Sequence, residues 1–229
     1  MENVKIFFEK HFFFLYKGDF VRENKRIKTY EDNEMIEDKN LEWKEVKCQH
    51  IVQDEYIDFR RSDYLLPDGT VFGPYYSYSR RDYVVIVAID EDGKYICVKQ
   101  FRHGIKRVTV EFCAGGLERE DGKEYGNRGD AGKAESALDA AKRELMEETG
   151  YESDDWKFLL SIPSNPTIAD NYANIFLAKN CHKVSGQNLD DTEFLNVDLY
   201  TKEEIDALIE AGDFPQVSHV MALLLAEKN

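Results

Sequence analysis

The stretch GDAGKAESALDAAKRELMEETGY, residues 129–151, contains three glutamates that decide how this chain is interpreted. Glu144, Glu147 and Glu148 stand at positions i, i+3 and i+4, so a helix would carry all three carboxylates on one face. Like charges at this spacing destabilise a helix by roughly 0.2–0.5 kcal/mol per pair. Mg²⁺ binds carboxylates and substrate phosphates together, which would turn this repulsion into binding. The segment therefore favours a cation-binding helix over a solvated acidic helix, the usual explanation of a run of charges.

The same segment resembles the Nudix box, G-x5-E-x7-R-E-U-x-E-E-x-G-U, in which U is a bulky apolar residue. The matching residues are Gly129, Glu135, Arg143, Glu144, Leu145, Glu147, Glu148 and Gly150. Tyr151 fills the last apolar position, which is a mild departure. So many matches over one segment form a far stronger signal than a lone glycine motif. The resemblance implies the Nudix fold, a mixed sheet flanked by helices in an α/β/α sandwich.

The formal charge of −15 limits the partners of this protein. A nonspecific nucleic-acid binder needs a basic surface, so we expect no nucleic-acid partner. The aromatic residues 7–16 are interrupted by charges and resemble neither a signal peptide nor a membrane span, which needs about 20 apolar residues. Cys48, Cys97, Cys113 and Cys181 form no Cys-x-x-Cys motif and fit a reducing compartment. We therefore expect a cytoplasmic protein without a membrane partner.

Hydrophobic periodicity and turn residues predict an α+β protein in two parts. Residues 1–82 would form an N-terminal extension and a small antiparallel β domain that serves dimerisation, and residues 83–229 the Nudix hydrolase domain. The expected strands are 46–52, 56–60, 75–78, 83–89, 94–99, 108–112, 156–162, 172–178 and 194–199. Strands that precede a helix, followed by further strands and helices, indicate a mixed fold and not an alternating parallel one.

Three helices are expected in the second part. The box helix would run from about residue 131 to 149, with Gly150 as its left-handed stop. Its inner stripe would consist of Ala134, Leu138, Ala141 and Leu145. Thr201 opens a capping box, so a second helix would follow it and end at Gly212. The last helix would span residues 217–226.

Segments outside the box resemble the ADP-ribose pyrophosphatase branch of the Nudix family. Gln100-Phe101-Arg102 is similar to its Gln-Tyr-Arg segment, and Glu111 to Gly116 to its Leu-Glu-x-x-Ala-Gly segment. The resemblance implies that the Ala114 carbonyl ligates metal and that Arg102 and Glu111 help to hold the substrate. Pro166, sixteen residues past the box glycine, marks the same branch as a substrate-side residue. Thr167 stands where that branch usually has glycine.

An acidic loop at residues 189–193 resembles the loop that supplies one more carboxylate to the site in this branch. Glu193 aligns best with that carboxylate, and Asp191 is the alternative. A long segment separates Gly115 and Gly116 from Glu135. Gly129 therefore matches the first glycine of the Nudix box by its spacing, but it need not occupy the same place in the structure. We interpret residues 118–132 as an insertion beside the site, and loops of that length are often functional.

The resemblance implies a metal-dependent pyrophosphohydrolase. The Ala114 carbonyl and Glu144, Glu147 and Glu148 would hold Mg²⁺, or alternatively Mn²⁺, since all their ligand atoms are oxygens. Glu193 or Glu148 would accept the proton of the attacking water. Arg143 would anchor the box carboxylates by charge-assisted hydrogen bonds, with Glu135 in the same structural role.

The expected reaction is hydrolysis of a nucleoside diphosphate linked to another group. ADP-ribose, giving AMP and ribose 5-phosphate, is the leading substrate, and another nucleotide sugar or a dinucleotide is the alternative. A non-catalytic nucleotide sensor is a second class, but such proteins commonly lose a box carboxylate and here all three are present. The branch also implies a homodimer whose N-terminal sheets exchange across the interface.

Overall fold

A buried apolar strand, β4 (Tyr83–Asp90), lies in the middle of the main sheet of the computed structural model, which describes residues 41–54, 56–119 and 134–229. Residues 84–88 of this strand are fully buried. In the described part of the chain the sheet has the order β10-β5-β6-β4-β9-β7, and β8 pairs with β9. The other strands of this sheet are β5 (Tyr95–Arg102), β6 (Arg107–Gly116), β7 (Tyr151–Glu152), β8 (Asp155–Pro163), β9 (Tyr172–Lys183) and β10 (Leu195–Tyr200).

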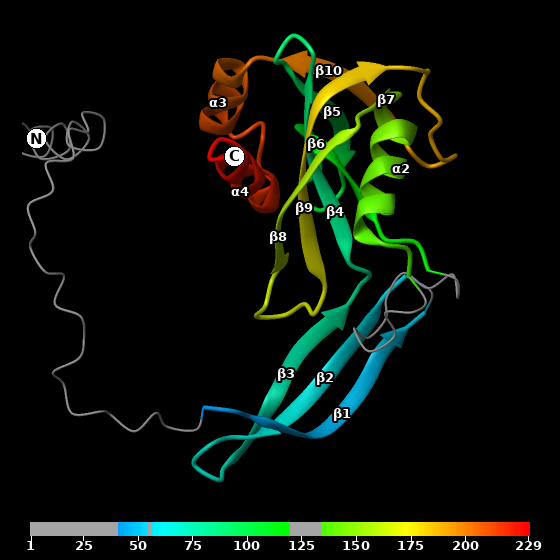
Figure 1. Ribbon diagram of the computed structural model, residues 1–229. Coiled ribbons are helices and arrows are strands. Elements are labelled where there is room, and N and C mark those ends of the chain that lie inside the picture. The colour runs from blue at the N-terminus through cyan, green and yellow to red at the C-terminus, as the bar shows by residue number, and fades with distance from the viewer. Residues whose placement is uncertain (1–40, 55, 120–133) are drawn as a thin grey trace, which may run out of the picture. The chain divides into compact units, whose positions relative to one another are not determined.

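Helices cover both faces of this sheet (Figure 1). The helix α2 (Ala137–Thr149) packs on one face, while α3 (Lys202–Ala211) and α4 (Val217–Ala226) pack on the other. Alternate residues of β4 enter the two cores, since Val84 and Ile86 join the α2 side and Val85 joins the other. β4 and β9 are parallel, and the remaining pairs are antiparallel. The predicted α+β sandwich is confirmed.

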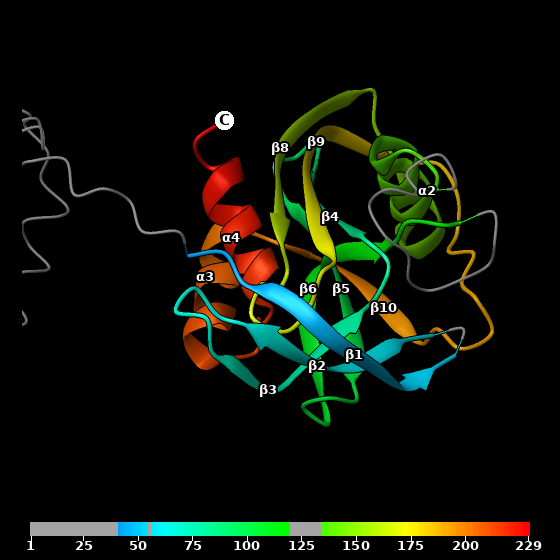
Figure 2. The ribbon, with the colours of Figure 1, turned by 90° about the horizontal axis from the view of Figure 1, so that it is seen from below.

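The three N-terminal strands form a separate antiparallel sheet of order β1-β2-β3 (Figure 2). They are β1 (Lys44–Gln53), β2 (Asp58–Leu65) and β3 (Val71–Ser79). β1 and β3 cover the expected strands 46–52 and 75–78, whereas β2 begins later than the expected strand 56–60 and overlaps it only at residues 58–60. All ten residues of β1 are exposed. The small β sheet is thus confirmed, whereas residues 1–40 lie outside the described residues.

The box helix begins later than the sequence predicts. Ser136 is its N-cap and accepts a hydrogen bond from the Asp139 amide at 3.1 Å, so helical backbone starts at Ala137 and not near residue 131. Residues 131–133 lie outside the described residues, and Ala134 forms an isolated β-bridge with Arg119. Ala134 is therefore not part of the inner stripe. Leu138 is also exposed, and the buried apolar residues of α2 are Ala140, Ala141 and Leu145.

The remaining helix ends agree with the sequence. Gly150 ends α2 with a φ of 72°, and Gly212 ends α3 with a φ of 76°, a left-handed conformation that favours glycine. Thr201 and Glu204 form the expected capping box at the start of α3. Among the described residues, no helix is both long enough and apolar enough to cross a membrane.

A buried histidine makes the stability of this fold depend on pH. Nδ1 of His219, on α4, accepts a hydrogen bond from the Phe112 amide at 3.1 Å, and its ring stacks on the Phe112 ring. Burial, and to a lesser degree the charge of Arg102, lowers the pKa of His219 to about 3. The folded protein therefore keeps this ring neutral under conditions in which the unfolded chain protonates it.

We expect the free energy of unfolding to fall as the pH drops from about 6.5 towards 3, because only the unfolded chain binds this proton there. One such group contributes a slope of about 1.4 kcal/mol per pH unit. Urea unfolding of the wild type and of His219→Gln at several pH values measures it, since the variant lacks this contribution. Parallel pH profiles for the two proteins would contradict the assignment.

Candidate active site

The end of β6 and the middle of α2 approach each other so closely that a side chain at Gly115 would have to displace the Glu144 carboxylate. A Cβ atom at Gly115 would overlap the carboxylate of Glu144. The adjacent Gly116 lies against the guanidinium of Arg81 in the same way. Gly115 lets α2 place the Glu144 carboxylate against the backbone of the strand end, and Gly116 leaves room for the Arg81 side chain.

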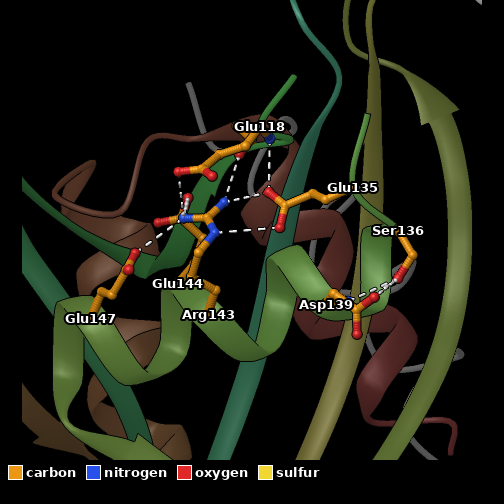
Figure 3. Close-up of polar contacts among 8 residues, drawn as sticks. Glu118, Glu135, Ser136, Asp139, Arg143, Glu144 and Glu147 are labelled. Atoms are coloured by element: carbon orange, nitrogen blue, oxygen red, sulfur yellow. Dashed lines mark hydrogen bonds and ion pairs between the residues drawn. The ribbon is translucent and has the colours of Figure 1, made fainter. Parts of the chain in front are cut away.

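Arg143 organises the carboxylates of the box (Figure 3). Its Nη1 donates hydrogen bonds to Glu144 Oε1 at 2.9 Å and to Glu147 Oε2 at 3.0 Å. Its Nη2 donates to Glu135 Oε1 at 2.5 Å and to the Gly116 carbonyl at 3.1 Å. Burial alone would lower the pKa of this guanidinium, but hydrogen bonds and attraction to the three glutamates raise it. The expected anchoring geometry of Arg143 and Glu135 is present.

The residues at the two ends of the predicted insertion meet beside this network. The Glu118 amide donates to Glu135 Oε1 at 2.7 Å, and the Glu135 amide donates to the Glu118 carbonyl at 3.0 Å. Arg119 and Ala134 form a β-bridge just inside these contacts. The described residues on the two sides of the predicted insertion therefore lie next to each other. Gly129 falls within residues 120–133, outside the described residues.

Two of the box carboxylates are buried. Glu144 is 8% exposed and Glu148 is 4% exposed. Glu148 Oε2 accepts a hydrogen bond from the Ala114 amide at 3.3 Å. Burial, together with the nearby charges of Glu144 and Glu193, raises the pKa of Glu148 to about 8, although contacts with Cys113 and Ala114 act in the opposite direction. Burial also raises the pKa of Glu144. The negative charge in this corner is thus poorly compensated by the protein itself.

The chemistry of these donors fits a hard divalent cation, because all of them are oxygens and two carboxylates are buried without a full countercharge. Within the described ranges, however, no three His, Cys, Asp or Glu side chains converge closely enough to enclose an ion. Glu144 and Glu147 both lie within hydrogen-bonding distance of Arg143 Nη1, at 2.9 and 3.0 Å. The donor types are suited to a cation, while their arrangement here is set by Arg143.

The two residues expected to hold the substrate are paired with each other. Arg102 lies at the end of β5, and Glu111 lies in β6 and is fully buried. The Nη2 atom of Arg102 is 2.5 Å from Glu111 Oε1, and its Nε donates to Glu111 Oε2 at 3.2 Å. Arg102 is 36% exposed, so its guanidinium is accessible from solvent even while it neutralises Glu111.

The loop residues of the predicted site occupy two different connections. Pro166 is exposed in the connection between β8 and β9. Glu193 is half-buried in a turn before β10, where its amide donates to the Asp190 carbonyl at 2.9 Å. Its charge raises the pKa of both Glu144 and Glu148, so it lies on the carboxylate side of α2. Asp191, the alternative to Glu193, is exposed.

One segment that stabilises the end of α2 was not predicted from the sequence. The segment before β10 caps the end of α2, because Gln187 Nε2 donates to the Glu148 carbonyl at 2.8 Å and the Asn188 amide donates to the Glu147 carbonyl at 2.8 Å. These bonds satisfy carbonyls that a helix end leaves open. They also tie the segment that leads into the acidic loop to α2. No local pattern marks a partner that lies some 40 residues further along the chain.

Both the sequence and the fold of this chain are similar to those of known proteins. Residues 79–220 match the sequence profile of the NUDIX domain. The chain is 31% identical to the ADP-ribose pyrophosphatase of Bacillus subtilis, over 76% of this chain and 87% of that protein. It is 29% identical to the methanol dehydrogenase activator of Bacillus methanolicus, over 72% of this chain and 82% of that protein. A crystal structure of an ADP compounds hydrolase has the same fold, with a TM-score of 0.68 and 23% identity over 83% of this chain and 96% of that chain.

The close approach at Gly115 gives a direct test of this geometry. We expect Gly115→Ala to displace the Glu144 carboxylate and to reduce kcat/KM by about 100-fold, because a misplacement of about 1 Å at a reacting site has effects of this size. Gly104→Ala is the matched control, since a Cβ there meets nothing within 4 Å. Steady-state kinetics of both variants measure the difference, and an unimpaired Gly115→Ala enzyme would disprove the packing argument.

Proposed function

The chain belongs to the NUDIX domain family and is a Nudix pyrophosphohydrolase, and from that premise we propose that its substrate is ADP-ribose, which it cleaves to AMP and ribose 5-phosphate. The observation that carries this proposal is the pair of buried carboxylates at the end of β6: Arg143 holds Glu144 against Gly115, and the Ala114 amide donates to Glu148. Support for the substrate comes from the similarity to the Bacillus subtilis ADP-ribose pyrophosphatase.

Nudix hydrolases use divalent cations, and we propose Mg²⁺ here, with Mn²⁺ as the alternative. Glu144, Glu147, Glu148 and the Ala114 carbonyl would hold it. When bound, the cation offsets the charge of a diphosphate and lowers the pKa of a water molecule. The protein contributes the placement of the ligands: Arg143 fixes the rotamers of Glu144 and Glu147, and the Ala114 amide fixes that of Glu148.

Proton transfer needs a carboxylate that can reach the attacking water. We assign this role to Glu193, because it is half-buried on a loop and its charge is felt by both buried glutamates. Glu148 is the alternative, since its carboxylate lies at the end of β6 against the Ala114 amide. Arg102, Glu111 and Pro166 would form the substrate side of the site, with Glu111 acting through Arg102, which it orients.

Two further parts of the proposal concern assembly and location. We propose a homodimer formed through the small sheet, whose strands expose many large apolar side chains. They are Val46, Ile51, Val52, Val71, Phe72, Tyr75 and Tyr76, and Trp43, directly before β1, is exposed as well. We also propose a reducing, cytoplasmic environment, in keeping with four free cysteines, of which Cys97, Cys113 and Cys181 are buried.

A substrate screen tests the central proposal. The purified protein is incubated with Mg²⁺ and with ADP-ribose, other nucleotide sugars or dinucleotides, and the released monophosphates are separated and quantified. Hydrolysis of ADP-ribose to equal amounts of AMP and ribose 5-phosphate is the expected result. A clear preference for another nucleotide sugar or dinucleotide would reassign the substrate within the family.

Glu148→Gln should abolish Mg²⁺-dependent hydrolysis and leave the fold intact. The amide has the size of the carboxylate but lacks the charge that a cation needs, and the wild-type side chain is almost fully buried. Activity and circular dichroism are measured together, with Glu210→Gln, an exposed change on α3, as the control. Turnover close to that of the wild type in a folded Glu148→Gln variant would remove Glu148 from the site.

The dimer proposal predicts a particle of twice the chain mass in light scattering. Exposed aromatic residues on a sheet favour association because burying them removes apolar surface from water. Phe72→Asp, on the exposed part of β3, should shift the mass towards the monomer. A monomeric mass for the wild type at working concentration would be incompatible with this arrangement.

A further inference from the structure

The loop between β8 and β9, residues 164–171, is closed by its own hydrogen bonds. The Ser164 amide donates to the Asn171 carbonyl at 3.0 Å, and the Ser164 hydroxyl donates to Asn171 Oδ1 at 2.6 Å. Inside the loop, the Ala169 amide donates to the Asn165 carbonyl at 2.8 Å. Pro166 stands exposed on this closed turn. These bonds join the two ends of the loop and fix its shape independently of its outer contacts.

Those outer contacts come from the small N-terminal sheet. The Tyr78 amide on β3 donates to the Ile168 carbonyl at 2.8 Å, and Tyr78 forms an isolated parallel bridge with Ala169. The hydroxyl of Ser79, the next residue, donates to the Asp170 carboxylate. Sheet and loop are therefore joined by backbone hydrogen bonds and by Asp170.

A second strand of the small sheet contributes a charged contact. Arg60 on β2 donates from Nη2 to Asp170 Oδ2 at 3.2 Å and from Nη1 to Asp58 Oδ2 at 3.2 Å. Asp58 is buried, and its other oxygen lies 2.6 Å from His50 Nδ1 on β1. Asp58 thus holds the planar guanidinium of Arg60 through Nη1, and Nη2 is directed at Asp170 in the loop.

The loop is also connected to the catalytic helix. Asn171 Nδ2 donates to the Arg81 carbonyl at 3.3 Å, and the Tyr172 amide donates to Asp82 Oδ1 at 2.8 Å. On its other side, Asp82 accepts a hydrogen bond from the Leu117 amide at 2.9 Å through its carbonyl. Leu117 directly follows Gly116, whose carbonyl binds Arg143. A short path of hydrogen bonds therefore runs from the loop to the box.

We propose that Arg60 and Asp170 are positioning residues for substrate binding: their ion pair holds the Pro166 loop in the place where it meets the substrate. The inference rests on the proposed function for the role of Pro166, but the placement of the loop can be tested without activity. Without the pair, the loop occupies its binding-competent position for a smaller fraction of the time, and apparent affinity falls by that fraction. The carboxylates on α2 are untouched, so the chemical step is preserved.

The kinetic test compares Asp170→Asn, Arg60→Lys and the double variant with the wild type, using Mg²⁺ and ADP-ribose. Asp170 is 44% exposed, so its replacement does not disturb a core. We expect KM to rise about fivefold and kcat to stay within about twofold, and the double variant to be no worse than the single ones. Asp206→Asn, which breaks the exposed Lys202–Asp206 pair on α3, is the matched control and should change neither constant.

Hydrogen exchange of the substrate-free protein gives the independent readout. The Tyr78 amide, which donates to Ile168, should exchange several-fold faster in Asp170→Asn than in the wild type or in Asp206→Asn. An unchanged KM, or a raised KM with unchanged Tyr78 exchange, would overturn the positioning role. A wild-type enzyme inactive on ADP-ribose would instead overturn the proposed substrate, and Tyr78 exchange would then decide the role of the ion pair alone.

Discussion

The guanidinium of Arg143 is the group on which the arrangement of the candidate site depends. It binds three carboxylates and one backbone carbonyl, and these acceptors come from α2, from the segment before it and from the end of β6. Its planar fork lets one side chain hold several acceptors in fixed directions. Without this cation, negative charges would be gathered at the strand end with no compensation. Arg143 therefore allows the carboxylates to be close together before a metal or a substrate arrives.

Burial makes the carboxylates of the candidate site unfavourable for the stability of the folded protein. Glu144 and Glu148 are almost fully buried, and removing a carboxylate from water is unfavourable unless the charge is paired. Arg143 serves Glu144, while Glu148 has a backbone amide and a raised pKa. This is the environment expected of groups that act on a charged ligand, because desolvated charges interact more strongly than exposed ones. The loss of folding free energy that comes from burying Glu144 and Glu148 is consistent with a catalytic use of these carboxylates.

Chain topology brings the other parts of the site to the same end of the main sheet. The first residue of β4, Tyr83, pairs with Gly116 at the end of β6 and with Ala173 near the start of β9. The residues just before β4 therefore lie between the strand that leads to the box and the loop that carries Pro166. The small sheet enters through this connection, and Arg60 links it to Asp170. A contact made in the N-terminal sheet can in this way influence the substrate side of the hydrolase domain.

Local sequence was sufficient for the elements and for the face of the helix that carries the carboxylates. Turns, caps and 3.6-residue spacing act over a few residues, which is why β4, the capping box at Thr201, the stop at Gly150 and the common face of Glu144, Glu147 and Glu148 were all predictable.

The remaining contacts of the candidate site depend on the tertiary structure. The meeting of Glu118 with Glu135, the pairing of Arg102 with Glu111 and the close contact of Gly115 with Glu144 involve partners from 9 to 29 residues apart. Such contacts depend on the packing of a helix against a strand end, and no short-range pattern encodes the distance between them.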